Sequence, residues 1–441
     1  MTIDQLQLYT ATGGYLPSFF KMAVRSGESF LDIQNLSEST ASTYFHEYMH
    51  YIQDVGTFHG LSNIIRMGEY LHYCRKFIEN GNAVFNVPIP AELIDSGVNI
   101  SAKIGQVLNG SMHNIGHSVE IDEIKVRKTG VISSDGIDIP EVVIVYNNGQ
   151  EYLFGALAVN ESMAYIGEKQ IFPASPLAPT FPYHSAELMA RFIFPEFAAN
   201  KLNIFALCDV ALMSAEPGPT YYNYLLKLKA SGFESNDPKD IYEFFKNEIF
   251  EFQGWKLNRI QMLSTLGQIA RIYLKGYFPA EAYEANVTWM DHIIDHAVGL
   301  RNRNISFPLD IILHGSFYDN PELDLTMKNI GGPLQLNENA NATFIIIEQL
   351  ADKMIQPDLN WVISDILKVI LGSTRSCGMK DFCKASATHQ GLPDYTNSLC
   401  DINPWFRAYN DIDCSMTRVL KMWKLDKKIP RNNFHDTAGT T

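Results

Sequence analysis

The segment YFHEYMHYIQ, residues 44 to 53, holds two histidines four residues apart, with a glutamate directly after the first. In an α-helix, side chains four residues apart lie one above the other, so the rings of His46 and His50 can reach one ion together. Zinc binds imidazole nitrogens at about 2.0–2.1 Å and prefers four ligands. Glu47 lies on the adjacent flank of the helix, where its carboxylate can accept a proton from a water at the metal. The segment therefore predicts two zinc ligands and a general base.

A catalytic zinc ion needs a third protein ligand and keeps one position open for water. The spacing H-E-x-x-H-x-x-G-x-x-H would supply a third histidine, but Gln53 and Gly56 occupy the matching positions. The third ligand is therefore expected from a later helix. The segment GALAVNESMAYIGE, residues 155 to 168, follows a strand-like run and offers two glutamates.

These two segments together resemble the gluzincins, the thermolysin-like zinc peptidases. Residues 46 to 50 match their H-E-x-x-H motif, and Asn160, Glu161 and Ala164 match their N-E-x-x-[AS]-D segment, whose glutamate is the third zinc ligand. The chain departs from that pattern at Tyr165, which stands where the family has its second acid. The long stretch between the two motifs would have to hold a β-rich insertion.

The resemblance implies a zinc-dependent peptidase in which His46, His50 and Glu161 hold one Zn2+. Glu47 would assist the attack of a zinc-bound water on a peptide bond. Read without the resemblance, Glu161 is an ordinary acid that the helix dipole favours near an N-terminus, and Glu168 is the alternative ligand. Two other functions stay open, a catalytically inactive metal-binding scaffold for a partner protein and a zinc hydrolase acting on a non-peptide amide.

Supporting roles are expected for a few neighbours of these ligands. A ligating histidine normally donates its second ring N–H to a carboxylate or carbonyl, and Asp54 is placed to accept it from His50. The oxyanion that develops during hydrolysis needs a hydrogen-bond donor. Tyr165 and His184 are the predicted catalytic candidates for this role, with Tyr183 beside them, and packing is the alternative for each.

Four of the six cysteines lie near the C-terminus at irregular spacing: Cys377, Cys383, Cys400 and Cys414. Structural zinc ligands usually come in closer pairs such as C-x2-C. A second, structural Zn2+, buried free thiols and disulfides are the three interpretations that stay open. His292 and His296 are also four apart, but no glutamate follows the first, and they predict a polar helical face.

The elements that position the candidate residues follow from periodicity and capping. Ser37 or Ser39 can cap a helix that carries apolar residues at spacings of three or four and ends at Gly56. A second helix is predicted at 61–79. Residues 82–154 are β-rich, with a hairpin turn at Asn148–Gly149.

The fold class predicted is α+β and predominantly helical, with a zincin-like catalytic part, a β-rich insertion and a helical C-terminal half. Helical patterns cover most of residues 184 to about 300, including 238–252, and two more helices are predicted at 342–355 and 358–371. Three regions are expected: a zincin-like catalytic region at 1–230, a helical region at 231–372 and a cysteine-containing segment at 373–441.

Composition limits the partners. The formal net charge of −14 argues against nucleic acid and against an anionic membrane surface. No run of 18 apolar residues and no N-terminal secretory pattern is present, so the predicted compartment is the cytoplasm. The predicted partners are a peptide or protein substrate and a protein bound through the helical C-terminal half.

Overall fold

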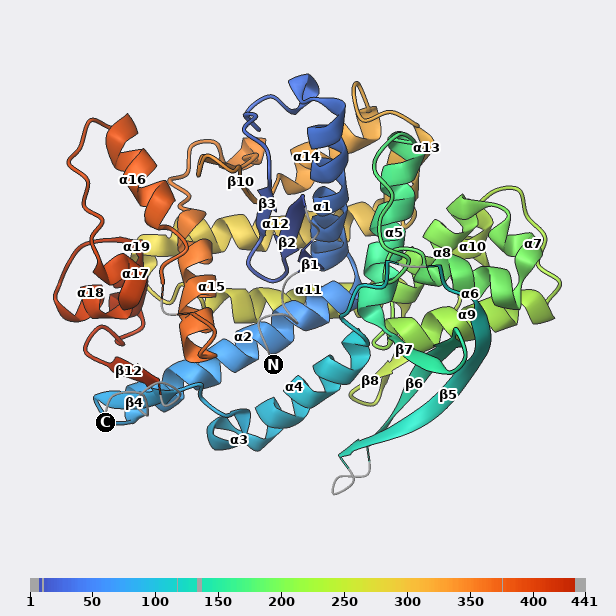
Figure 1. The fold of residues 1–441 in the computed structure, drawn as a ribbon, viewed down its shortest axis with the longest axis horizontal. Helices are drawn as coiled ribbons and strands as arrows, with labels where there is room; N and C mark the ends of the chain where they lie inside the picture. The colour runs from blue at the N-terminus through green and yellow to red at the C-terminus, as the bar shows by residue number, and fades with distance from the viewer. Residues whose placement is uncertain (1–7, 10–11, 117, 133–136, 375, 433–441) are drawn as a thin grey trace.

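The computed structural model describes residues 8–9, 12–116, 118–132, 137–374 and 376–432. The chain is mostly helical and carries several small sheets, which confirms the predicted predominantly helical α+β class (Figure 1). Buried hydrophobic side chains from Tyr15 to Leu425 form one connected core. The division into three regions stays a prediction.

The largest sheet joins the beginning of the chain to a segment far along it. Its strands follow the order β1 (Leu8–Tyr9), β2 (Gly13–Leu16), β3 (Lys21–Val24), β10 (Leu334–Leu336) and β11 (Ala342–Thr343). All neighbours are antiparallel except β3 and β10, which run parallel with Met22 opposite Gln335. Strands β2 and β3 pack against the helix that carries the two histidines.

That helix is α1 (Glu38–Gly56), and its start agrees with the capping prediction because the Ser37 hydroxyl accepts a hydrogen bond from the Thr40 amide at 3.5 Å. It is buried on almost every side by the sheet and by three helices, α2 (Phe58–Asn80), α5 (Ala156–Ile171) and α12 (Glu284–Arg303) (Figure 1). Thr57 ends α1 and caps α2 through its hydroxyl, so the two helices follow one another directly.

A buried ion pair fixes the C-terminal end of α1. Arg301 of α12 donates to both carboxylate oxygens of Asp209 at 2.7 Å, and Asp209 lies on α8 (Lys201–Leu212). The Arg301 Nε also donates to the carbonyl of Gly56 at 2.9 Å. One guanidinium therefore ties α1 to α8 and α12.

The region predicted as β-rich, residues 82–154, is so only in part. Strand β4 (Val84–Val87) is followed by α3 (Ala91–Ile94) and α4 (Ser96–Asn109), and only then by β5 (Ile121–Ile132), β6 (Ile137–Tyr146) and β7 (Gln150–Phe154). The prediction missed α4, although the sequence holds both a cap and a helical stripe for it. The helix is capped by the Asp95 carboxylate and buries Val98, Ala102 and Leu108 on one face. The turn at Asn148–Gly149 is confirmed, with φ of 67° and 99°.

The later part of the chain is helical, as predicted, apart from two segments. Within 238–252, only α10 (Lys239–Phe244) is a helix, and β8 (Ile249–Phe252) forms a hairpin with β9 (Trp255–Asn258). Residues 342–355 form β11 and a 3-10 turn at Glu348–Leu350, because pairing with β10 outweighs the helical periodicity.

The remaining helices cover the core. They are α6 (Ser185–Ile193), α7 (Pro195–Ala198), α9 (Pro217–Ala230), α11 (Arg259–Lys275), α13 (Phe307–Leu313), α14 (Pro321–Ile330), α15 (Asp358–Ile370), α16 (Lys380–His389), α17 (Leu399–Ile402), α18 (Trp405–Tyr409) and α19 (Ser415–Met422). Strand β12 (Ile429–Asn432) pairs in parallel with β4. Among the described residues, no helix combines the length and apolar character that a membrane crossing requires.

Candidate metal centre

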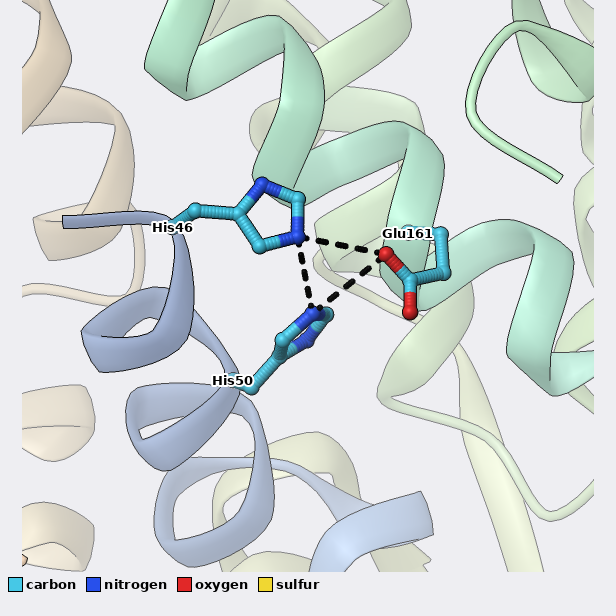
Figure 2. Close-up of side chains that lie close together, drawn as sticks. All are labelled: His46, His50 and Glu161. Atoms are coloured by element: carbon cyan, nitrogen blue, oxygen red, sulfur yellow. Dashed lines mark hydrogen bonds and ion pairs between the residues drawn. The ribbon is translucent and has the colours of Figure 1, made fainter. Parts of the chain in front are cut away.

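Two helices bring the three predicted ligands together. His46 and His50 project from α1 toward Glu161 of α5 (Figure 2). The His46 Nε2 lies 3.2 Å from Glu161 Oε2 and 3.2 Å from His50 Nε2, and the His50 Nε2 lies 3.5 Å from the same carboxylate oxygen. All three side chains are buried, with at most 3 % of their surface exposed. The three atoms thus form a small, nearly equilateral triangle.

This triangle has the size that a tetrahedral zinc ion requires. Ligand atoms about 2.0–2.1 Å from a tetrahedral ion lie about 3.3–3.4 Å from one another. The three measured separations lie close to that value on either side. Among the described residues, His46, His50 and Glu161 are the one group of three or more potential ligands whose atoms all lie within 4.8 Å of one another. The residues present therefore fit a zinc ion.

A close backbone contact positions the start of α5. Gly155 ends the β7–α5 connection, and a Cβ on it would lie 2.5 Å from backbone atoms of Asn109 and Gly110 at the end of α4. Only glycine permits this approach, which lets α5 begin directly after β7. Glu161 then falls in the second turn of α5, facing α1.

Glu168 holds the second ring nitrogen of His46 instead of acting as a ligand. Its Oε2 lies 3.0 Å from His46 Nδ1, and its Oε1 accepts a hydrogen bond from the Ser42 hydroxyl at 2.7 Å. The alternative prediction of Glu168 as the third ligand is therefore wrong. Glu168 lies two helical turns after Glu161 on the same face of α5, a spacing that the sequence already contained. Glu168 thus supplies a second carboxylate, which the gluzincin motif has at the position of Tyr165.

The second ring nitrogen of His50 is held by an amide. The His50 Nδ1 lies 2.7 Å from the Oε1 of Gln53, and the Gln53 Nε2 donates to the carbonyl of Asn160 at 3.0 Å. Asn160 directly precedes the ligand Glu161, so this chain of hydrogen bonds fixes the histidine relative to α5. Sequence reasoning missed Gln53, although a residue three positions after a helical histidine lies on the same face.

Asp54, the predicted partner of His50, binds elsewhere. Its Oδ2 accepts hydrogen bonds from the Tyr15 hydroxyl and the Ser18 amide, both at 2.8 Å. Burial raises the pKa of Asp54 to about 7, although both hydrogen bonds act in the opposite direction. The prediction for Asp54 is wrong because its side chain joins α1 to the β2–β3 region rather than to the ligands.

The electrostatics of the triangle favour a positive charge. Burial lowers the pKa of His46, but its hydrogen bonds to the carboxylates of Glu161 and Glu168 outweigh burial and raise the pKa well above its usual value. Burial alone would raise the pKa of Glu161, but His50 and His46 together lower it. The carboxylates therefore stabilise a positive charge between the two rings, and a divalent metal ion would supply that charge.

Glu47, the predicted general base, directly follows His46 on α1 and is fully buried. Its carboxylate faces strand β2, where a Cβ added to Gly13 would lie 2.8 Å from the Glu47 Oε1. The glycine lets the strand pass directly over the carboxylate. Glu47 is thus a buried acid between α1 and β2, and its role in proton transfer belongs to the proposal below.

A row of rings leads away from His46. The Tyr183 ring lies 6.0 Å from the His46 ring and 5.8 Å from that of Tyr165, which in turn lies 4.8 Å from His184. Burial raises the pKa of Tyr183, and Glu161 and other site carboxylates raise it further, so the hydroxyl keeps its proton. Tyr183 is the ring beside the ligand, and Tyr165 and His184 lie behind it. The catalytic roles of Tyr165 and His184 stay predictions.

The cysteines do not form the second zinc site. All six are free thiols, so the disulfide alternative is wrong. Four thiolates about 2.3 Å from one zinc ion would lie about 3.8 Å apart, yet no three thiols of the described chain lie within 4.8 Å of one another. The prediction of a structural Zn2+ at Cys377, Cys383, Cys400 and Cys414 is therefore not supported. Likewise, His292 and His296 stack on each other at 3.8 Å and belong to no group of potential ligands among the described residues.

Comparison of the chain with protein-family models, curated proteins and solved structures gives no match. The resemblance to gluzincins therefore depends on the two motifs, and the structure adds the buried His46–His50–Glu161 triangle to them.

Proposed function

We propose that this chain is a zinc-dependent peptidase of the gluzincin type. The observation that carries the proposal is the match between the triangle of His46, His50 and Glu161 and the edge lengths of a zinc tetrahedron. Glu47, the residue after His46 on α1, is fully buried and is the proposed general base. These four residues are the set that the sequence motifs predict.

Each residue has a defined task in peptide hydrolysis. A zinc ion at the triangle would supply a Lewis acid that lowers the pKa of water and polarises a carbonyl. Glu47 removes the proton of the attacking water and passes it to the nitrogen of the leaving amine. The Tyr183 hydroxyl, which keeps its proton, donates a hydrogen bond to the oxyanion that develops. Glu168 and Gln53 hold the two rings in orientation.

A second candidate is hydrolysis of a small, non-peptide amide. The burial of the site favours it, because at most 3 % of the surface of each ligand is exposed and Glu47 is fully buried. A folded protein does not reach such a site in this conformation, whereas a small amide or an extended peptide needs a narrower opening.

The variant Glu47→Gln tests the proposal. Glutamine keeps the size of the side chain and cannot take the proton, so the zinc content should stay at the parent value while hydrolysis falls by about 10²–10⁴-fold. The assay is cleavage of a fluorogenic peptide library, followed by cleavage of small amides and anilides. Glu92→Gln, an acid on α3, is the matched control.

The outcomes separate the three functions. Peptide cleavage that Glu47→Gln abolishes supports the peptidase, and cleavage of small amides alone supports the second candidate. A parent protein that binds zinc and cleaves neither class would support the inactive scaffold. Full activity of Glu47→Gln would exclude the mechanism.

A further inference from the structure

The four C-terminal cysteines meet at one cavity. The cavity has about 350 Å³ of unoccupied space, part of it open to solvent, and its walls include Cys377, Cys383, Cys400, Cys414 and Arg407. In Figure 1 the helices around it, α16 to α19, lie on the side of the molecule away from α5. The cavity is therefore separate from the His46–His50–Glu161 site.

A buried cation without a carboxylate partner faces these thiols. Arg407 is 2 % exposed, and its Nη1 donates to the Cys400 Sγ at 3.3 Å and to the Asn397 Oδ1 at 2.9 Å. Its Nη2 donates to the carbonyl of Tyr395 at 3.0 Å, and its buried Nε has no hydrogen-bond partner. None of the ion pairs in the described part of the chain involves Arg407. A buried guanidinium without a counter-charge is unfavourable, so an anion is expected in this cavity.

A second sulfur also faces a hydrogen-bond donor. Cys414 is the N-cap of α19, and its Sγ accepts a hydrogen bond from the Thr417 amide at 3.5 Å. A helix N-terminus and a neighbouring guanidinium both stabilise a thiolate over a thiol. A free thiol is mostly neutral at pH 7, whereas a metal-bound sulfur is a thiolate. The donors therefore favour thiolates at Cys400 and Cys414, whereas burial raises the pKa of Cys377 and Cys383, so a bound metal is needed to keep all four sulfurs deprotonated.

The spacing of the described thiols argues against a single metal ion. One zinc ion would draw four sulfurs to about 3.8 Å from one another, and no three of the described thiols lie within 4.8 Å. An iron–sulfur cluster is held by four cysteine thiolates, contains several bridged iron atoms and so spreads its ligands further apart than a single ion. Hydrogen bonds to the cysteine sulfurs are also among the features that tune such clusters.

We propose that the four thiols of this cavity bind one iron–sulfur cluster and that Arg407 is its buried counter-charge. On assembly each thiol releases its proton to solvent and forms one sulfur–iron bond, while ferric iron, ferrous iron and sulfide enter as co-reactants, so that the mixed oxidation state of the cluster needs no further oxidant. The cluster would fasten the loops of the C-terminal segment, where the Cys377 amide already donates to the carbonyl of Cys400 at 2.7 Å. The proposal does not depend on peptidase activity.

Anaerobic reconstitution tests the site. The full chain is reduced with a thiol, freed of the reductant, incubated with ferric iron, ferrous iron and sulfide, desalted, and analysed for iron, acid-labile sulfide and visible absorption. The expected result is equal iron and sulfide, at least about two of each per chain, with the absorption of a cluster. Cys400→Ser should lose most of both, whereas Cys74→Ser, a change at a buried cysteine on α2, should keep them.

The controls separate a lost site from a lost fold. Zinc bound at the His46–His50–Glu161 site and the circular dichroism spectrum report whether Cys400→Ser is folded. If Cys400→Ser is unfolded, the iron and sulfide contents of the parent and of Cys74→Ser still test the proposal. A parent that takes up no sulfide, that binds only zinc at these thiols, or that loses no iron in folded Cys400→Ser would overturn the proposal.

Discussion

Replacement of Glu168 by glutamine tests how far the protein tunes its ligands from outside the triangle. Glu168 does not touch the predicted metal position, but its Oε2 lies 3.0 Å from the Nδ1 of His46. Glutamine keeps a carbonyl oxygen that can accept the same hydrogen bond and removes the negative charge. The change therefore isolates the electrostatic part of the interaction.

The expected magnitude follows from this geometry. Adding the width of the imidazole ring and one coordination bond places the carboxylate about 7 Å from an ion on Nε2. A single negative charge and a divalent cation at that distance attract by about 1 kcal/mol in water and about 5 kcal/mol at an effective dielectric constant of about 20. A loss of zinc affinity by about 10–100-fold, or about 1.4–2.8 kcal/mol, lies within this range.

The assay is competition for zinc against a chromophoric chelator at fixed pH. Glu248→Gln is the matched control, because Glu248 is a partly buried carboxylate that pairs with Arg259 at 3.0 Å and belongs to no group of potential ligands in the described chain. Ser42→Ala removes one hydrogen bond to Glu168 and should weaken zinc binding less than Glu168→Gln does. A Glu168→Gln protein that binds zinc within twofold of the parent would refute the tuning role.

Three further predictions concern the hydroxyl, the buried acid and the ion pair. Tyr183→Phe should lower kcat by about 10²–10³-fold with zinc content and KM nearly unchanged; an unchanged kcat would exclude its role as a donor. Burial raises the pKa of Asp54 from 3.8 to about 7. Between these two pH values the folded state therefore holds a proton that the unfolded state has released. The parent should therefore lose up to about 4 kcal/mol of unfolding free energy as the pH rises from about 4 through about 7. The unfolding free energy of Asp54→Asn, measured by urea titration at several pH values, should lack this pH dependence. An equal pH dependence in the parent and in Asp54→Asn would contradict the prediction. Asp209→Asn leaves Arg301 buried without its counter-charge and should lower the unfolding free energy by about 3–5 kcal/mol, whereas a loss below about 1 kcal/mol would show that the pair is dispensable.

Local signals explain what the sequence could predict. The histidine pair, the cap at Ser37 and the end of α1 near Gly56 all lie within one helix, where spacing and capping determine which side chains share a face. Glu161 could be predicted because it lies in a short motif of its own. The turn at Asn148–Gly149 was reachable because positive φ is costly for most residues.

Long-range packing explains the rest. The contact between Glu168 and His46 joins residues on different helices, and no spacing rule predicts which acid of α5 faces which ring nitrogen. Asp54 was assigned to His50 by proximity in sequence, but its partner Tyr15 comes from a strand far away. The convergence of the cysteines on one cavity likewise depends on tertiary packing of the C-terminal segment.

The most direct test of the central claim is the zinc content per chain of the parent and of Glu161→Ala, purified side by side without added metal. We expect about one zinc at the His46–His50–Glu161 site of the parent and little or none at that site in the variant, because two histidines alone leave the tetrahedron incomplete. Circular dichroism shows that the variant is folded. Equal zinc in both proteins, or none in the parent even after dialysis against zinc, would contradict the assignment of these three residues as a metal centre.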